Sequence, residues 1–498
     1  MTVGAFLVMG YHPGLEDDAF YLAAIKRNLN PALFPHGADF FRLQFQATIF
    51  DKLIAASVRV MHVPLGWLNL DWVILAWQLA AIFLILHGCW RIGCRCFTSR
   101  PAQWGAVALV AALLTIPVSG TGINLADQYL HPRNLATALI LAAVVDVLDR
   151  KLIRAAVLLA IAFSIHAIMA SFGISLCFFL WWNLRAHSKR AAALSASVAP
   201  AMIVPLYLPL HWLFEPSSDA WRQAASTRSF YYVAHWQWYE WLGILAPLAL
   251  LWAAQRWLKR RGLKQRTSST PLPALASALV YYGLFQMLFG LLLMLPPALE
   301  RLRPFEPMRY LQLLYLFLFL IIGGLLGEFL LQKHVYRWAL LFIPLSAGMF
   351  YAQRAMYPAT AHLELPGRAS GNQWLQAFAW IRQNTPTDSL FALDPHYMEL
   401  PGEDFHGFRA LAERSVLADY VKDGGMAARV PPLAPRWLRE VNAQQGWRNF
   451  GAPDFTRLKT EFGVNWIVLS KTDRAAASFG DSSHCPFAND QVLVCRLY

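Results

Sequence analysis

The chain has 498 residues, of which 57% are hydrophobic and 15% charged, and its formal net charge is +13. Soluble domains are about 25% charged, and the mean hydropathy here is +0.37. This balance argues against an ordinary soluble protein and favours a multi-pass membrane protein. The sequence has no basic stripe with interleaved aromatics on a soluble segment, so we expect no nucleic-acid partner.

Ten apolar runs approach the length needed to cross about 30 Å of hydrocarbon at about 1.5 Å per residue. They are roughly 70–89, 103–119, 134–148, 152–166, 167–184, 191–213, 237–256, 273–296, 309–331 and 338–353. The short apolar segment 1–11 counts as part of a further crossing. The sequence therefore predicts a mainly α, polytopic membrane protein with about 10 or 11 transmembrane helices.

Basic residues gather in every second link between these runs. Five links carry 17 Lys and Arg in all; they are "WRIGCRCFTSR", "DRKLIR", "RAHSKR", "QRWLKRRGLKQR" and "KHVYR". The alternate links 120–133, 214–236 and 297–308 carry few. The positive-inside rule places the basic links and the amino terminus in the cytoplasm, and the alternate links and the carboxy terminus outside.

The last part of the chain differs in charge from the rest. Residues 354–498 carry 15 Lys and Arg against 15 Asp and Glu. "NQWLQAFAWIRQNTP" has helical spacing and ends at a proline, whereas "DSLFALDP", "VNWIVLS" and "QVLVCRLY" are typical of short buried strands. We predict a transmembrane domain over 1–353 and a small extramembrane α/β domain over 354–498. Cys485 and Cys495 are suited to one disulfide if this domain lies in an oxidising space.

Three adjacent acids, Glu16, Asp17 and Asp18, follow the first apolar segment. One interpretation is structural, with Asp17 or Asp18 capping a helix over 19–29. That accounts for one or two acids but less well for three beside a membrane, where each charge needs water or a polar cavity. The functional interpretation is a general base or metal ligand at the outer surface.

Two later outer links carry further polar candidates. "GTGINLADQYLHPRN" gathers Asp127, His131 and Arg133, either as a solvated turn before a helix or as the lining of the same outer cavity. "PPALERLRPFEPMRYL" holds Arg303, Arg309 and the adjacent Tyr310. Guanidinium matches phosphate geometry, whereas interfacial anchoring is the structural alternative.

Four motifs carry a family resemblance: "LEDDAFYL" (15–22), "LHPRN" (130–134), "MRYLQL" (308–313) and "WIRQNTP" (380–386). With the predicted architecture they resemble the GT-C superfamily of membrane glycosyltransferases, which use polyprenyl-phosphate-linked sugars. The resemblance implies a catalytic carboxylate at Asp17 or Asp18, with Arg303 and Arg309 on the donor phosphate. The remaining expected substrate-binding residues are Glu16, Asp127, His131, Arg133 and Tyr310.

The resemblance implies sugar transfer from a lipid-linked donor in the membrane to a glycan, lipid or protein acceptor. It places the chain in a bacterial inner membrane with a periplasmic tail. Asp17 and Asp18 are adjacent and not a spaced DxD pair, which disfavours a divalent metal cofactor. Two alternatives stay open: a lipid or glycan flippase, although the runs are nearly free of mid-helix charges, and a non-catalytic membrane protein.

Overall fold

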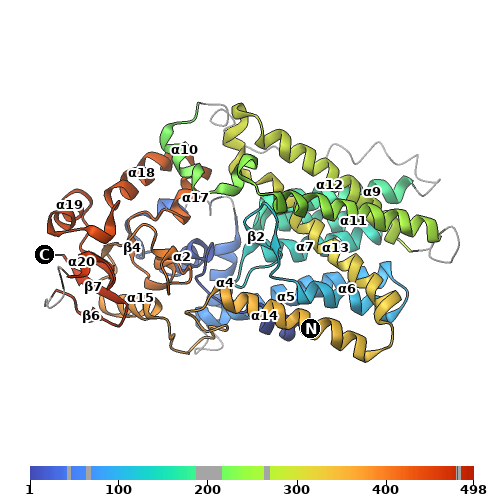
Figure 1. Ribbon diagram of the computed structural model, residues 1–498, viewed down its shortest axis with the longest axis horizontal. Helices are drawn as coiled ribbons and strands as arrows, with labels where there is room; N and C mark the ends of the chain where they lie inside the picture. Colours follow the sequence, from blue (N-terminus) through green and yellow to red (C-terminus); the bar gives the residue numbers. More distant parts are fainter. Residues whose placement is uncertain are drawn as a thin grey trace.

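The computed structural model describes residues 1–41, 46, 48–62, 69–186, 216–262, 270–477, 479 and 484–497. Over these residues the chain is mainly helical and elongated. A bundle of long helices occupies one end, and a small sheet with short helices occupies the other (Figure 1). The predicted combination of a helical bundle and a small C-terminal sheet region is confirmed.

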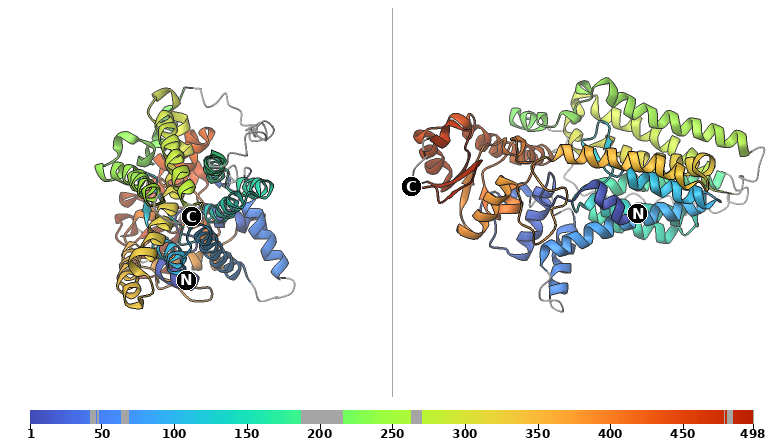
Figure 2. Two further views of the ribbon diagram at one scale, coloured as in Figure 1. Left: turned by 90° about the vertical axis from the view of Figure 1, so that its right-hand side faces the viewer. Right: turned by 60° about the horizontal axis from the view of Figure 1, so that its bottom comes forward.

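Six of the described helices are long and apolar enough to cross a membrane. They are α5 (Leu70–Cys96), α9 (Ala167–Ala186), α11 (Trp238–Gly262), α12 (Leu272–Met294), α13 (Leu311–Leu326, continued by a π turn over Gly327–Leu331) and α14 (Val335–Met356). They run roughly side by side along the long axis (Figure 2). Length and composition of these helices fit an integral membrane protein.

Other predicted runs form shorter helices. These are α6 (Arg100–Ala112), α7 (Pro132–Leu148) and α8 (Leu152–Ile165), while the first apolar segment forms α1 (Thr2–Met9). The predicted run 191–213 lies outside the described residues. A boundary predicted at residue 353 falls three residues before the end of α14.

Packing inside the bundle relies on small residues where helices cross. A Cβ placed on Gly105 of α6 would lie 2.3 Å from the carbonyl oxygen of Gly323 in α13, so only glycine permits this approach. On the outside of the bundle, Leu340 and Ile343 of α14 are 75% and 67% exposed. Apolar side chains exposed along a helix fit a surface that faces lipid.

Short elements lie between the bundle and the sheet. They are α2 (Asp18–Leu29), α4 (Phe50–His62), the two-stranded hairpin β1 (Pro117–Val118) and β2 (Ile123–Asn124), α10 (Asp219–Ser226), and 3-10 turns over Ser229–Tyr231, Val233–His235, Pro297–Phe305 and Pro307–Tyr310.

The C-terminal sheet has the order β4-β3-β5-β7-β6. Its strands are β3 (Leu390–Ala392), β4 (Ser415–Val416), β5 (Trp466–Ser470), β6 (Phe487–Ala488) and β7 (Val492–Arg496). Strands β4, β3 and β5 are parallel, whereas β7 pairs antiparallel with β5 and β6. Three of these strands, β3, β5 and β7, were predicted from the sequence. Cys485 and Cys495 form the disulfide that the sequence allowed.

Six helices surround this sheet: α15 (Gln373–Asn384), α16 (Phe408–Ala412), α17 (Lys422–Arg429), α18 (Ala434–Ala443), α19 (Ala452–Phe462) and α20 (Arg474–Ala477). The first is the helix predicted from "NQWLQAFAWIRQNTP". Asn372 caps it, because its side-chain oxygen accepts a hydrogen bond of 2.8 Å from the backbone N–H of Trp374.

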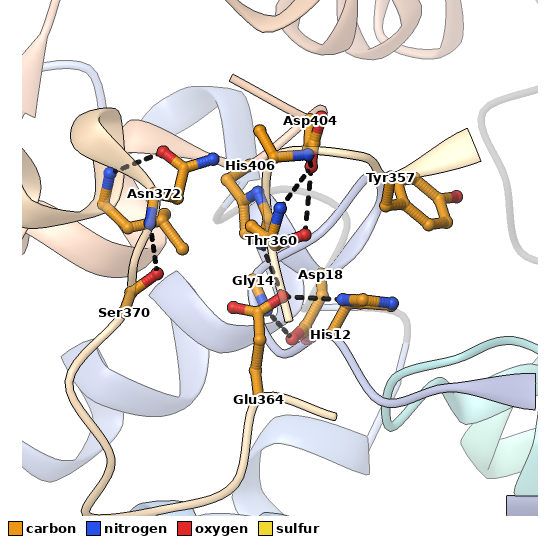
Figure 3. A network of polar contacts seen from close by, with 12 residues as sticks. His12, Gly14, Asp18, Tyr357, Thr360, Glu364, Ser370, Asn372, Asp404 and His406 are labelled. Atoms are coloured by element: carbon orange, nitrogen blue, oxygen red, sulfur yellow. Dashed lines mark hydrogen bonds and ion pairs between the residues drawn. The ribbon is translucent and has the colours of Figure 1, made fainter. Parts of the chain in front are cut away.

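A buried polar network joins the N-terminal loop to the C-terminal domain (Figure 3). We call it the Glu364 network. Glu364 Oε1 lies 2.6 Å from His12 Nδ1 and 3.1 Å from His406 Nε2. Asp404 accepts hydrogen bonds of 2.8 Å from the backbone N–H groups of Ala359 and Thr360. The loop before α2, the linker after α14 and the C-terminal domain are therefore fixed to one another.

Candidate functional site

A cavity of about 470 Å³ lies where the bundle meets the C-terminal domain. We call it the junction cavity. It is lined by parts of six separate regions: residues 16–21, 117–133, 228–240, 306–309, 356–357 and 422–429. Of the predicted site residues, Glu16, Asp17, Asp127, Arg133 and Arg309 line it. Side chains from distant parts of the sequence thus share one hollow.

The two adjacent aspartates have different environments. Asp17 precedes α2 at the N-cap position, but its side chain makes no capping hydrogen bond. Asp18 is buried, and its Oδ2 accepts a hydrogen bond of 2.7 Å from the backbone N–H of Gly14, upstream of the helix. The predicted capping of α2 by Asp17 or Asp18 is therefore wrong. Asp18 binds the preceding loop, and Asp17 contacts other side chains.

Asp17 meets two side chains at the edge of the junction cavity. Its Oδ1 lies 3.0 Å from Nζ of Lys422, and its Oδ2 lies 3.8 Å from Nε2 of His131. Burial by itself would raise the pKa of Asp17, but Lys422 and His131 together hold it well below its usual value. The side chain is 29% exposed, so an ionised carboxylate faces the cavity.

Asp18 has the opposite electrostatic character. Burial raises its pKa to about 7, and the hydrogen bond from Gly14 and the charge of Lys26 only partly oppose this. A group with this pKa is partly protonated at neutral pH. Asp17 lines the junction cavity, whereas Asp18 does not.

His131 lies beside the carboxylate of Asp17. Its Nδ1 accepts a hydrogen bond of 2.9 Å from the backbone N–H of Arg133. Burial and the charge of Arg133 lower the pKa of His131. The ring is therefore neutral at pH 7, with its proton on Nε2, the nitrogen nearest Asp17.

Buried amides hold the loop that carries Asp127. Gln78 Nε2 donates to the carbonyl of Asp127 over 2.8 Å, and Gln312 Nε2 donates to that of Leu125 over 2.7 Å. Because these amides come from α5 and α13, the bundle itself positions the loop. Arg133 then pairs with the Asp127 carboxylate, and both side chains are buried.

Cations and acids are unevenly distributed around the junction cavity. Its lining holds five cationic side chains: Arg133, Arg228, Arg309, Lys422 and Arg429. On one side, Glu16 and Asp17 share the single cation Lys422. On another, Arg309 and Arg429 share the single acid Glu306, at 2.6 and 2.9 Å. The cavity thus has an acid-rich side and an arginine-rich side.

Three arginines of the cavity lining each have a buried nitrogen that makes no hydrogen bond to a described residue. Nε of Arg133, Arg309 and Arg429 is buried with no hydrogen-bond partner among the described residues. Buried donors without acceptors are costly, and an anionic ligand would satisfy them. The arginine-rich side therefore has the chemistry of an anion site.

The remaining predicted residues lie outside this cavity. Arg303 donates from Nε to the carbonyl of Met294 over 3.0 Å, and its guanidinium lies 5.0 Å from the ring centre of Tyr232. Tyr310 is fully buried in the bundle, with its ring 6.0 Å from that of Tyr282. The structure brings Arg309 to the cavity, but Arg303 and Tyr310 do not line it.

Three cations of the cavity were not among the predicted site residues. Lys422 and Arg429 stand seven positions apart in α17, which places them on one helix face. That spacing in "VKDGGMAARV" was a usable signal. The net charge of zero over residues 354–498 gives no sign of this cationic face. Arg228 lies in the link 214–236, which carries few Lys and Arg.

The sequence raises the question of whether Asp17 and Asp18 bind a metal ion together. They turn to different partners and do not form a paired carboxylate site. Within the described ranges, no group of three or more His, Cys, Asp or Glu is placed to hold a metal ion.

Comparison with protein-family models gives a match to part of the C-terminal domain. A family model for a domain of unknown function (DUF6798) matches residues 372–428, from the cap of α15 almost to the end of α17. A search of curated proteins finds no match. The matched segment includes Lys422 and stops one residue before Arg429, so it covers most of the part of the tail that borders the junction cavity.

Proposed function

We propose that this protein is an inverting membrane glycosyltransferase that moves a sugar from a polyprenyl-phosphate donor to an acceptor hydroxyl. One observation carries the proposal. An ionised, partly exposed carboxylate, Asp17, shares a cavity of about 470 Å³ with an arginine-rich side that has unpaired guanidinium nitrogens. Sugar transfer from a phosphate needs both a proton acceptor and a site for the departing anion.

Asp17 is the proposed general base. In the transfer step its carboxylate takes the proton of the acceptor hydroxyl while the hydroxyl oxygen bonds to the anomeric carbon of the sugar. The bond from that carbon to the phosphate oxygen breaks, and its electron pair leaves with the polyprenyl phosphate. His131 lies beside this carboxylate, with its Nε2 3.8 Å from Asp17 Oδ2.

The leaving phosphate would be held by Arg309 and Arg429. Arg309 is buried and Arg429 is partly buried beside Glu306, and a setting with little water strengthens their attraction to developing negative charge. Since Glu306 neutralises only one of the two cations, one positive charge remains for the phosphate.

The membrane setting supports a lipid-linked donor. The cavity lies at the end of the bundle on the same side as the links 120–133 and 297–308, which the distribution of Lys and Arg assigns to the outer face. We accordingly propose the outer face for the reaction, with the amino terminus inside, the C-terminal domain outside, and more crossings than the six longest helices. A polyprenyl chain would lie along the bundle while its phosphate enters the cavity.

The test is a complementation experiment in a host whose own copy of the gene is deleted. Wild type, Asp17→Asn and Asp18→Asn are each supplied, and the envelope glycans are compared by mass spectrometry. We expect wild type and Asp18→Asn to restore a sugar that the deletion lacks, and Asp17→Asn not to. Equal restoration by Asp17→Asn at matched protein levels would exclude Asp17 as the base.

A further inference from the structure

A second hollow, of about 690 Å³, lies in the C-terminal domain. We call it the aromatic cleft. Its floor is formed where the parallel strands β3 and β4 end, by Asp394 and His396 after β3 and by Tyr420 after β4. Ligands of open α/β sheets bind at this edge, outside the carboxyl ends of the strands.

Two helices and a loop form the walls of the aromatic cleft. One wall is α18 with the loop 444–449, and the other is α10, which contributes Gln223 and Ser226. α10 belongs to the link 214–236 of the bundle region and packs against α17 and α18 (Figure 1). The cleft is therefore built jointly by the C-terminal domain and an outer link.

Aromatic rings form one continuous surface in this cleft. The ring centres of His396 and Tyr420 lie 4.3 Å apart, and those of Tyr420 and Trp437 lie 6.0 Å apart. Trp437 is fixed from behind, since its indole N–H donates to the carbonyl of Asp419 over 2.9 Å. Tyr420 is only partly buried, so its ring offers a flat, rigid face to a ligand.

Polar groups accompany the rings. The exposed amides of Asn442, Gln445 and Asn449 border the cleft and provide both donors and acceptors. Trp447 also lines it, and its indole N–H is buried with no acceptor among the described residues. A buried donor of this kind is costly unless a ligand oxygen satisfies it.

The charge of the aromatic cleft differs from that of the junction cavity. Its lining includes the acids Asp394 and Glu399 and one arginine, Arg448, whose Nε lies 3.8 Å from Asp394. There is no surplus of cations to attract a phosphate or sulfate group. A flat apolar face bordered by neutral amides and a carboxylate suits a ligand with many hydroxyl groups and no charge.

We propose that the aromatic cleft binds a neutral saccharide, with one sugar face against Tyr420 and a sugar oxygen accepting from Trp447. The proposal does not depend on the transfer reaction, because no residue of the cleft lines the junction cavity. An outer carbohydrate-binding site would hold a glycan close to the membrane surface.

The test uses the full chain in lipid nanodiscs and calorimetric titration with maltotriose, cellotriose, mannotriose and chitotriose, with inorganic phosphate as the charged comparison. We expect at least one of the four trisaccharides to bind. Tyr420→Ala should weaken that binding by about tenfold or more, and Trp447→Phe, which keeps a ring but removes the donor, by about three- to tenfold.

Two controls make the result specific. Trp380→Phe changes a tryptophan of α15 that stacks near Phe487, outside the cleft, and should leave binding unchanged. Asp17→Asn should also bind the saccharide normally, which separates this proposal from the transfer reaction. Binding of none of the four trisaccharides, or equal binding by wild type and Trp447→Phe, would overturn the proposal.

Discussion

The junction cavity and the aromatic cleft are two hollows built partly by the same C-terminal domain, and they differ most in charge. The cavity of about 470 Å³ contains five cations and acids in unequal groupings, whereas the larger cleft of about 690 Å³ contains aromatic rings, amides and a single arginine. Size alone would rank the cleft first. The placement of charge instead assigns an anion and a proton transfer to the cavity, and a neutral ligand to the cleft.

The largest expected effect is that of Asp17→Asn on transfer. Loss of a general base typically costs about 10²- to 10⁴-fold in rate, and the amide cannot take the proton. Saccharide binding in the aromatic cleft should be unchanged. The comparison is measured as sugar transfer per molecule of protein in membranes, beside calorimetric titration of the same variant.

The second-largest effect on transfer is expected when one guanidinium is removed from the arginine-rich side. Arg429→Gln leaves Glu306 paired with Arg309 only, so the surplus positive charge is lost, and we expect transfer to fall by about 100-fold. Arg303→Gln is the matched control, because Arg303 does not line the cavity. The assignment fails if both variants reduce transfer equally.

Lys422→Gln should move the pH dependence of transfer. Lys422 helps to keep the pKa of Asp17 below its usual value, so its removal raises that pKa. A base must be ionised to act, and the acidic limb of the pH–rate profile should therefore move to higher pH, by about one pH unit or more. An unmoved acidic limb would show that Lys422 has no influence on the reacting group.

Glu364→Gln should destabilise the region beside the junction cavity more than the region around the aromatic cleft. Burial would raise the pKa of Glu364, but His406 and His12 lower it to about 2, and Glu364 in turn raises the pKa of His406 despite the burial of that ring. The stabilisation from Glu364 is lost as pH falls from its usual pKa of 4.5 towards about 2. The stabilisation from His406 is complete below its usual pKa of 6.5 and is lost as pH rises through its raised value.

The Glu364 network should consequently be most stable in mildly acidic solution. We expect Glu364→Gln to reduce the free energy of unfolding there by about 1–3 kcal/mol and to increase hydrogen exchange in residues 357–372. Exchange around the aromatic cleft should change little. A uniform increase throughout the C-terminal domain would show that this network supports the whole domain and not the junction alone.

The smallest effect is expected for Asp18→Asn. Its Oδ2 accepts from Gly14 over 2.7 Å, and an asparagine oxygen can accept the same bond. Since its pKa is about 7, part of the wild-type population is already uncharged at neutral pH. Transfer should stay within about threefold of wild type, because the net contribution of one retained hydrogen bond is small. A loss as large as that of Asp17→Asn would move the base assignment to Asp18.

Periodicity and proline placement were enough to predict most of the long helices and strands β3, β5 and β7. The two-residue strands β4 and β6 were missed, because so short a segment has no measurable alternation. Local sequence also led to Asp17, Asp127 and Arg309 through their placement in outer links. It did not lead to Lys422 or Arg429, because their contacts with Asp17 and Glu306, 405 and 123 positions away, depend on how the C-terminal domain packs against the rest of the chain.

Two expectations based on local sequence also differ from the structure. They are the capping role of the aspartates and the position of Arg303. "LEDD" before a helix is typical of capping, yet the tertiary contacts of Asp17 with Lys422 and His131 override that preference. Arg303 and Arg309 looked equivalent in the sequence. The 3-10 turns over 297–310 send one side chain to the cavity and the other to the ring of Tyr232.

Lipid binding is the most direct test of a phosphate site in the junction cavity. Native mass spectrometry of the purified full chain in nanodiscs would compare undecaprenyl phosphate with undecaprenol, which lacks the phosphate. We predict that wild type and Asp17→Asn retain undecaprenyl phosphate in strong preference to undecaprenol. Arg429→Gln should lose most of that preference, whereas Arg303→Gln should keep it. Equal retention of the two lipids by wild type, or an unchanged preference in Arg429→Gln, would contradict the assignment of the junction cavity as a phosphate site.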